Sequence, residues 1–300
     1  MQQRVRVPNW YDLLASIHAW VYPDVQPVPE ITTPLAFGRI IKIGTQMVPL
    51  IVRQQNAGRP LTAIIDSTND QELSGQMLQQ KIEHILGLDI SFKDALDVIS
   101  KEPAISVIAP QVRGIRPYIA DTLFEALVKS IIQQQITYRA ANVITMRLVL
   151  GLGASTVFDG IELHAFPNSR DFLKCGEAGL REYGLGYKTK CILEVSQRVE
   201  SGELDLDTLL GSNYEDASEV LCPIRGIGEW TLQAFMIAGL GDLTVFPYGD
   251  VAMQNLLGRI YNNGLRMSKS QIQLKSSEWG AAGPKVLYLL MCAEVLGFIE

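Results

Sequence analysis

Residues 221–231 read Leu221-Cys222-Pro223-Ile224-Arg225-Gly226-Ile227-Gly228-Glu229-Trp230-Thr231. Pro223 breaks a preceding helix, and two glycines allow a tight hairpin before a second helix that begins at Glu229. Without side chains at positions 226 and 228, backbone N–H groups point outward at the positive end of that helix. Such a turn can hold nucleic-acid phosphates without reading base sequence. The stretch therefore predicts two helices joined by a phosphate-binding hairpin over about residues 219–239.

A carboxylate at the start of a helix follows the hairpin, twenty residues after Trp230. Pro247 and Gly249 bend the chain, and Asp250 stands directly before an evident helical sequence, 251–257. This is an N-cap position, where a carboxylate stabilises the helix by about 1 kcal/mol. Because the cap hydrogen bonds also hold the carboxylate still, Asp250 is at the same time a candidate catalytic group.

Composition excludes binding of nucleic acid through overall basicity. The 300-residue chain is 47% hydrophobic and 19% charged, with a formal net charge of −6, and its length favours two domains. A nucleic-acid-binding function would have to depend on a local basic patch. The candidates are Arg113, Arg116, Arg139, Arg147, Arg181, Lys188, Lys190, Arg198 and Arg225. Taken alone, these side chains are equally well explained as ordinary solvated helix faces.

Motifs for metals and for targeting are not found in the sequence. The four cysteines and three histidines are widely spaced, without a Cys-x-x-Cys pair or a metal-binding histidine motif. We therefore expect no iron–sulfur cluster and no required cofactor. The N-terminal sequence does not have the pattern of a signal peptide, and the late apolar run 286–298 is too short to span a bilayer. We expect a cytoplasmic protein without a membrane partner, associated with the nucleoid if the source is a prokaryote.

The first third of the chain has a mixed pattern. Residues 37–43, 47–53 and 61–66 are β-branched runs separated by turn formers, which predict an antiparallel sheet. Cap residues at 67–70 precede a helical pattern that reaches Leu86, and a short helix is expected from Phe92 to before Pro103. No residue here has obvious chemistry. We predict an N-terminal α+β domain, residues 1–112, with a packing role.

Helical periodicity dominates from residue 113 to residue 300, which predicts an all-α second domain. An apolar stripe over 123–132 follows Asp121, the expected cap, and Thr137 is expected to cap the next helix. Gln133-Gln134-Gln135 lies between them. Successive residues are about 100° apart around a helix, so three glutamines span about 200° and cannot share one polar face unless the helix ends there. A polar turn between two helices is the simplest interpretation.

Together these features resemble the helix-hairpin-helix superfamily of DNA base-excision glycosylases, and within it the 3-methyladenine DNA glycosylase II branch. The resemblance extends over nearly the whole chain, and its most specific block is the hairpin through Asp250. The other blocks are 82–89, Arg113-Gly114-Ile115-Arg116-Pro117, 123–128 with the glutamines, and Gly184-Leu185-Gly186 with Lys190. The resemblance implies an α+β fold, with an N-terminal antiparallel sheet and helices followed by an all-α helix-hairpin-helix core. It also implies that Asp250 is the essential catalytic residue.

The family's chemistry depends on the position two residues after the second hairpin glycine. Bifunctional glycosylase/lyase relatives, such as 8-oxoguanine glycosylase, have a lysine nucleophile there, whereas this chain has Trp230. An indole cannot form a Schiff base, so the resemblance implies a hydrolase without lyase activity. Trp230 would instead form a wall of the base pocket, with core packing as the alternative. Further pocket candidates are Phe235, Tyr248 and Trp279, for each of which core packing is the favoured alternative, while the pocket aromatics of some relatives fall here on Ala234 and Ala282.

The resemblance also implies contacts with damaged double-stranded DNA. The expected DNA-binding residues are Arg225, Gly226, Ile227, Gly228 and Thr231, with Gln135 as the wedge that fills the stack when a base is extruded. Family hairpins often hold a monovalent ion, Na⁺ or K⁺, on backbone carbonyls, here those of Cys222, Ile224 and Ile227. We expect the protein to act as a monomer.

These expectations define one leading function and two alternatives. The leading one is a monofunctional glycosylase of base excision repair that flips out alkylated purines of the 3-methyladenine and 7-methylguanine type and hydrolyses the N-glycosidic bond. The first alternative is a glycosylase for oxidised or deaminated bases. The second is a non-catalytic helix-hairpin-helix DNA-binding protein, which would have no use for a carboxylate at position 250.

Overall fold

The computed structural model describes residues 2–5, 7, 10–54, 61–65 and 75–299. Its N-terminal part contains a five-stranded antiparallel sheet with the strand order β1-β5-β4-β3-β2. The strands are β1 (Gln2–Val5), β2 (Ile31–Thr33), β3 (Ala36–Ile43), β4 (Gln46–Arg53) and β5 (Leu61–Ile65). The three strands predicted from the sequence are β3, β4 and β5, so the antiparallel sheet is confirmed. Strands β1 and β2 are too short to give a periodic signal.

Two helices pack with this sheet, α1 (Leu13–His18) and α2 (Gly75–Ile85). Leu13 of α1 and Ile82 of α2 are buried in one apolar cluster with Phe37 and Leu50 of the sheet. The helix predicted to reach Leu86 is therefore present as α2. The caps predicted for it at 67–70 lie outside the described residues.

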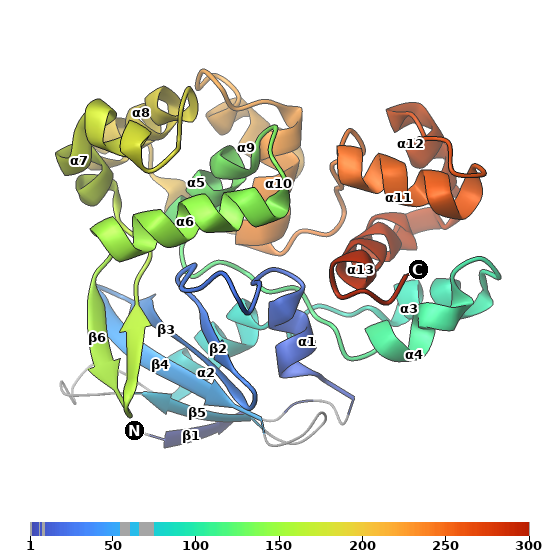
Figure 1. Ribbon diagram of the computed structural model, residues 1–300, viewed down its shortest axis with the longest axis horizontal. Coiled ribbons are helices and arrows are strands. Elements are labelled where there is room, and N and C mark those ends of the chain that lie inside the picture. Colours follow the sequence, from blue (N-terminus) through green and yellow to red (C-terminus); the bar gives the residue numbers. More distant parts are fainter. Residues whose placement is uncertain (1, 6, 8–9, 55–60, 66–74, 300) are drawn as a thin grey trace.

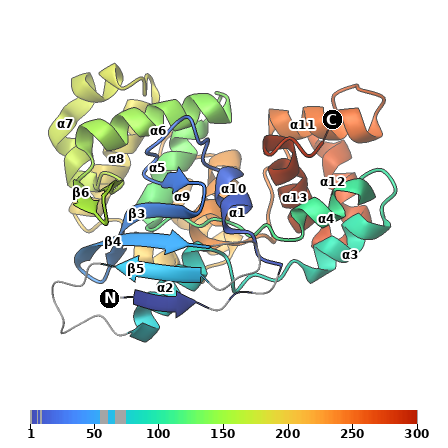
Figure 2. The ribbon, with the colours of Figure 1, turned by 60° about the horizontal axis from the view of Figure 1, so that its bottom comes forward.

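The remaining helices form two groups, one above the sheet and one beside it (Figures 1 and 2). One group surrounds a core that includes Leu127, Ile192 and Leu232. Its helices are α5 (Leu123–Gln133), α6 (Tyr138–Leu152), α7 (Ser169–Glu182), α8 (Lys188–Glu200), α9 (Tyr214–Leu221) and α10 (Glu229–Leu240). The second group consists of α11 (Val251–Tyr261), α12 (Lys269–Glu278) and α13 (Gly283–Val295), joined by α3 (Lys93–Lys101) and α4 (Ala109–Val112). The segment between α10 and α11 passes from one group to the other and contains Asp250.

Helices α3 and α4 precede the domain boundary predicted at residue 112 and pack with the C-terminal helices. Helix α3 was predicted correctly, but Ala95 and Ile99 on its buried face belong to the same apolar cluster as Val286 and Leu290 of α13. Helix α4 also contacts α13. The apolar faces of α3 and α4 are therefore buried by the C-terminal helices, and the boundary at residue 112 stays a prediction.

The C-terminal part is helical as predicted, except for one β-hairpin that was not predicted from the sequence. Strands β6 (Ser155–Phe158) and β7 (Ile161–His164) form an antiparallel hairpin between α6 and α7. This hairpin packs on the sheet, and Leu163 is buried against Ile40 and Ile51. A Cβ atom at Gly38 of β3 would lie 2.7 Å from Leu163 Cδ2, so glycine permits this close approach.

The helix caps are partly as predicted. Thr137 caps α6 by accepting the Ala140 N–H. The cap of α5 is Thr122, which accepts the Glu125 N–H, and not Asp121. Asp121 instead accepts the Lys42 N–H at 2.7 Å and forms an ion pair with Lys81 at 3.0 Å. A carboxylate expected to cap a helix thus links β3, α2 and the start of α5.

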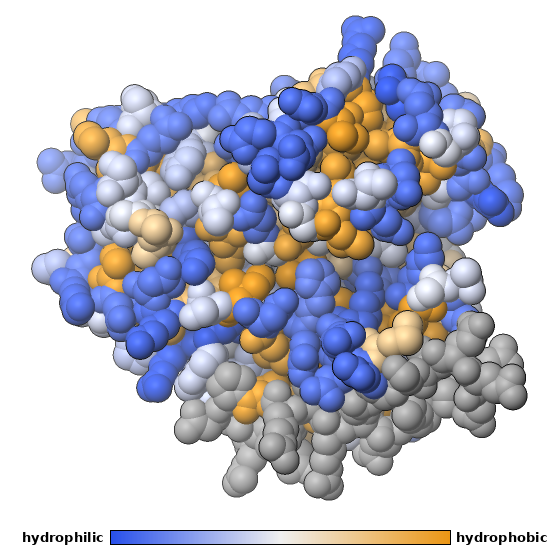
Figure 3. All heavy atoms as spheres, turned by 180° about the vertical axis from the view of Figure 1, so that it is seen from behind, coloured by the Kyte–Doolittle hydropathy of each residue, from blue (hydrophilic) through white to orange (hydrophobic). Residues whose placement is uncertain are grey.

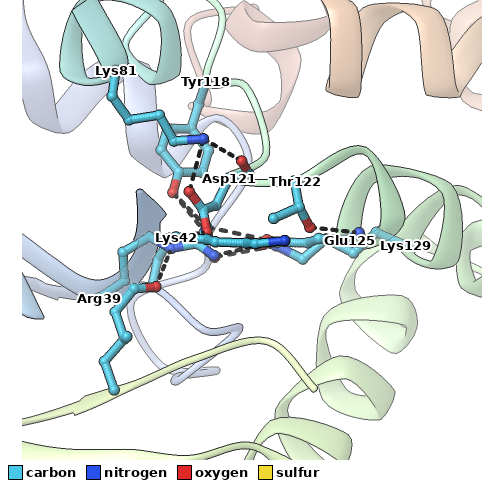
Figure 4. A network of polar contacts seen from close by, with 10 residues as sticks. Arg39, Lys42, Lys81, Tyr118, Asp121, Thr122, Glu125 and Lys129 are labelled. Carbon is cyan, nitrogen blue, oxygen red and sulfur yellow. Dashed lines mark hydrogen bonds and ion pairs between the residues drawn. The ribbon is translucent and has the colours of Figure 1, made fainter. Parts of the chain in front are cut away.

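A buried ionic cluster, defined here as Arg39, Glu30, Tyr118, Glu125 and Lys129, joins the sheet to α5 (Figure 4). Arg39 of β3 is 1% exposed, and its guanidinium contacts Glu30 and Glu125 at 2.5 Å each. The Lys129 ammonium contacts Glu125 at 2.7 Å, and the Tyr118 hydroxyl donates to Glu30 at 2.8 Å. Burial of these charges is tolerated only because each is paired. This buried ionic cluster, called the Arg39 cluster below, therefore fixes the orientation of α5, which ends at the glutamine turn.

The surface of the molecule carries both hydrophilic and hydrophobic residues. On the face seen from behind, hydrophilic side chains predominate and hydrophobic residues appear between them (Figure 3). Of the helices described, none combines the length and the apolar character that crossing a bilayer requires.

Candidate nucleic-acid and catalytic site

The predicted hairpin lies between α9 and α10. Gly226 has a φ of 100°, which favours glycine, and a Cβ atom there would lie 3.2 Å from Cys191 of α8. Ile227 is 5% exposed and points inward, and its N–H donates to the Ile224 carbonyl at 3.1 Å. A Cβ atom at Gly228 would meet nothing within 4 Å, so the N-terminus of α10 faces open space. The hairpin therefore leaves the predicted phosphate site at the N-terminus of α10 accessible.

Asp250 caps α11 and contacts the hairpin helix at the same time. Its Oδ1 accepts the Met253 N–H at 3.0 Å, and its Oδ2 accepts the Trp230 indole N–H at 3.2 Å. Both side chains are partly buried. A carboxylate has about four acceptor sites, so these two bonds fix its orientation and leave capacity for a water molecule and for attraction to a cation. The contact between Trp230 and Asp250 was not foreseen, because it depends on how α10 and α11 are placed.

For the glycosylase activity that the family resemblance implies, Trp230→Phe is expected to lower the single-turnover rate of base release about tenfold, the effect of losing one hydrogen bond to a charged group. The phenyl ring keeps an aromatic wall and removes only the donor to Asp250. Trp230→Ala, which removes the wall as well, should lower the rate further. A Trp230→Phe enzyme as fast as the wild type would show that the indole N–H has no role.

The other predicted pocket residues differ in their exposure. Phe235 is fully buried in the core formed by α5 and α10, so its prediction as a pocket wall is wrong and the core alternative holds. Trp279 is 8% exposed, and its indole N–H contacts Glu102 at 3.4 Å, which also makes it a packing residue. Tyr248, two residues before Asp250, is partly buried, and its hydroxyl lies 3.4 Å from that of Ser276. Tyr248 remains a candidate for the pocket.

The glutamine triplet forms the expected turn and also contacts the hairpin. Gln133 ends α5, and Gln135 is exposed with a φ of 57°. The Gln134 side-chain amide donates to the Gly226 carbonyl and to the Thr231 hydroxyl, each at 2.8 Å. The Thr231 side chain is 3% exposed and is occupied by its hydrogen bond with Gln134. Only the backbone N–H of Thr231 is therefore a candidate for contact with DNA. The sequence carried no signal for Gln134, because its partners lie more than ninety positions away.

Ion pairs reduce the set of candidate basic residues. Arg139, Arg181 and Arg198 are paired with nearby carboxylates. Arg116 is 4% exposed beneath Trp10, and Lys188 is 4% exposed with its ammonium on the Ile132 carbonyl. Among the described residues, the exposed candidates without a side-chain ion pair are Arg113, Arg147, Lys190 and Arg225. Lys190 precedes Cys191, which packs on Gly226, so Lys190 and Arg225 belong to the surroundings of the hairpin.

The predicted ion-binding carbonyls lie in the same hairpin. The Ile224 carbonyl already accepts the Ile227 N–H, but a carbonyl oxygen has a second lone pair for an ion. Carbonyl oxygens are ligands for hard cations such as Na⁺ and K⁺. Within the described part of the chain, no three His, Cys, Asp or Glu side chains are grouped as a metal site would require.

Known proteins are similar to this chain in sequence and in fold. Residues 128–282, more than half of the chain, match the HhH-GPD superfamily of base excision DNA repair proteins. The chain is 28% identical over 226 residues to a putative DNA-3-methyladenine glycosylase of Bacillus subtilis, covering 75% of each protein. It is 24% identical over 250 residues to a probable N-glycosylase/DNA lyase of Methanothermobacter thermautotrophicus, covering 74% of this chain and 77% of that protein. A solved 3-methyladenine DNA-glycosylase from Archaeoglobus fulgidus has the same fold, with a TM-score of 0.85 at 22% identity over 99% of this chain and 100% of that one. The chain belongs to the HhH-GPD superfamily of base excision DNA repair proteins and is a DNA glycosylase.

Proposed function

We propose that this protein is a monofunctional glycosylase that removes alkylated purines from double-stranded DNA and leaves an abasic site. One observation carries the proposal: the only side-chain donor that contacts Asp250 in the described structure is the indole of Trp230, at the position that a lysine nucleophile occupies in lyases. An indole forms no Schiff base. The name of the Bacillus subtilis relative, a putative DNA-3-methyladenine glycosylase, supports the same substrate class.

The chemistry needs one carboxylate and no general acid. Ordinary glycosidases use two carboxyl groups, one of which protonates the leaving group. A purine alkylated at N3 or N7 already carries a positive charge and leaves without a proton. Asp250, with its orientation fixed by Met253 and Trp230, would stabilise the positive charge that develops on the deoxyribose and orient the attacking water. The face of Trp230 would stack on the electron-poor base.

DNA binding in this proposal combines the hairpin with the glutamine turn. The N-terminus of α10 would bind backbone phosphates without reading sequence, assisted by Arg225 and Lys190. A Na⁺ or K⁺ ion on the hairpin carbonyls of Cys222, Ile224 and Ile227 would reinforce this contact. Gln135 would enter the stack from which the damaged base is extruded, at a cost of a few kcal/mol that the new contacts offset.

Gln135→Ala is expected to lower the rate of base release from paired substrates about tenfold, because the vacated stack is left unfilled. Release from the same lesion in a single strand, where no stack has to be opened, should change little. Rates under single turnover on both substrates test this. An unchanged rate on the duplex would exclude Gln135 as the wedge.

The second candidate function is a glycosylase for oxidised or deaminated bases. The N-glycosylase/DNA lyase relative favours it, although Trp230 opposes the lyase step. A panel of duplexes that each contain one 7-methylguanine, 3-methyladenine, 8-oxoguanine, uracil or hypoxanthine separates the two. We expect release of the methylated purines and little of the others. Release of an oxidised or deaminated base alone would support the second candidate instead.

A further inference from the structure

Gln134 connects two segments that are far apart in the sequence and that are both predicted to contact DNA. Its side-chain nitrogen donates to the Gly226 carbonyl in the hairpin and to the Thr231 hydroxyl in the first turn of α10, both at 2.8 Å. Both hydrogens of the amide are used, and both acceptors belong to the segment that carries the phosphate site. The loop that presents Gln135 is therefore hydrogen-bonded to the phosphate-binding hairpin through the preceding residue.

The same loop is fixed from its other side. The Lys188 ammonium, at the start of α8, donates to the Ile132 carbonyl in the last turn of α5. The Gln134 N–H donates to the Ile131 carbonyl at 3.3 Å, and the next residue, Gln135, has the left-handed φ of 57°. A non-glycine residue in this conformation is held there by its surroundings. The residues that precede Gln135 are therefore held by hydrogen bonds to α8 and to the hairpin, and the exposed Gln135 side chain follows them in the turn.

We propose that Gln134 is a positioning residue that couples phosphate binding to base extrusion. When the hairpin binds the DNA backbone, the Gln134 hydrogen bonds set the distance between those phosphates and the Gln135 side chain, so that Gln135 enters the stack at the damaged nucleotide. The inference rests on the base-flipping step of the proposed function. It assigns to Gln134 an effect on wedge insertion, without any contact to the substrate.

The test separates DNA binding, wedge insertion and chemistry in the full-length protein. Gln134→Met keeps the length of the side chain and removes its donors. Affinity is measured on undamaged duplex, and insertion is measured by the fluorescence of 2-aminopurine placed opposite a tetrahydrofuran abasic analogue, where no bond is cleaved. We expect affinity within about twofold of wild type, a largely lost fluorescence change, and about tenfold slower base release from an alkylated duplex.

Matched variants distinguish the hydrogen bonds from packing. Thr231→Ser keeps the hydroxyl acceptor, whereas Thr231→Val removes it, so the fluorescence change should be smaller in Thr231→Val than in Thr231→Ser. Gln133→Ala removes the neighbouring amide, which has no side-chain hydrogen bond among the described residues, and should leave insertion unchanged. Thermal unfolding of every variant is followed in parallel, so that a loss of fold is detected.

Each outcome decides the proposal. A fluorescence change in Gln134→Met equal to that of the wild type would overturn it, as would a wild type that shows no fluorescence change. A Gln134→Met defect that is explained by lower affinity alone would also overturn it. If the wild type inserts the wedge and Gln134→Met does not, but no alkylated base is released by either, the coupling stands and the proposed function fails.

Discussion

Asp250→Asn is expected to lower base release about 10³-fold or more, the largest effect among the variants considered. The substitution removes the negative charge that would stabilise the developing positive charge on the sugar. Asparagine caps helices as well as aspartate does, and its side-chain oxygen can still accept the Met253 N–H, so α11 should form normally. Affinity for undamaged duplex should therefore stay within about twofold. Single-turnover base release and fluorescence anisotropy measure the two properties.

A second substitution, Asp250→Ala, tests whether Asp250 is only a helix cap. Asp250→Ala removes both the charge and the cap, so it should lower thermal stability by about 1 kcal/mol as well as abolish base release. If Asp250→Asn retained wild-type turnover while Asp250→Ala lost stability, Asp250 would be a cap residue and the catalytic assignment would be wrong.

Arg39→Met is expected to lower the free energy of unfolding by about 3–5 kcal/mol, the usual effect of breaking a buried ion pair. Glu30 and Glu125 are 0% and 1% exposed, and after the substitution only Lys129 would compensate their charges.

Arg53→Met is the matched control. Arg53 lies in the neighbouring strand and pairs with Asp159 at 2.6 Å, but both side chains are about half exposed. This pair should contribute less than about 1 kcal/mol. Urea denaturation of both variants measures the difference, and equal effects would contradict it.

The Arg39 cluster also predicts how stability depends on pH. Burial alone would raise the pKa of the Glu125 carboxyl, but Arg39 and Lys129 outweigh burial and lower that pKa from 4.5 to about 2. Because the folded-state pKa is below the unfolded one, the stabilisation is fully present above about pH 4.5 and is lost as the pH falls through about 2. Wild-type stability should therefore decrease across this window by about 3 kcal/mol from this group, with a smaller decrease in Arg39→Met. Equal pH dependence in the two proteins would exclude this role.

Local chemistry explains which features could be predicted from the sequence. The hairpin depends on two glycines and a proline, the start of α11 on Asp250, and the start of α6 on Thr137, so each could be recognised from a few neighbouring residues. Strands β3 to β5 had a clear β-branched pattern. The identity of the catalytic candidate came from the spacing between Trp230 and Asp250 together with the family resemblance.

Features that depend on tertiary packing could not be predicted. Helix α10 is buried on nearly every side, so periodicity could not separate Phe235, a core residue, from Trp230, which reaches Asp250. Helix α3 was correctly placed in sequence, but its packing partner α13 begins nearly two hundred residues later. The hydrogen bonds of Gln134 and the pairing of Arg39 with Glu125 likewise join distant segments. Contacts of this kind cannot be recognised from the residues that neighbour either partner in the sequence.

The most direct test of the central claim is the incubation of methylated duplex DNA with the protein, followed by separate measurement of released bases and of strand breaks. If Asp250 activates water and Trp230 replaces the lyase nucleophile, free 3-methyladenine and 7-methylguanine are released, and the strand breaks only after alkali is added. Strand cleavage without alkali, or a protein–DNA adduct trapped by borohydride, would contradict the account.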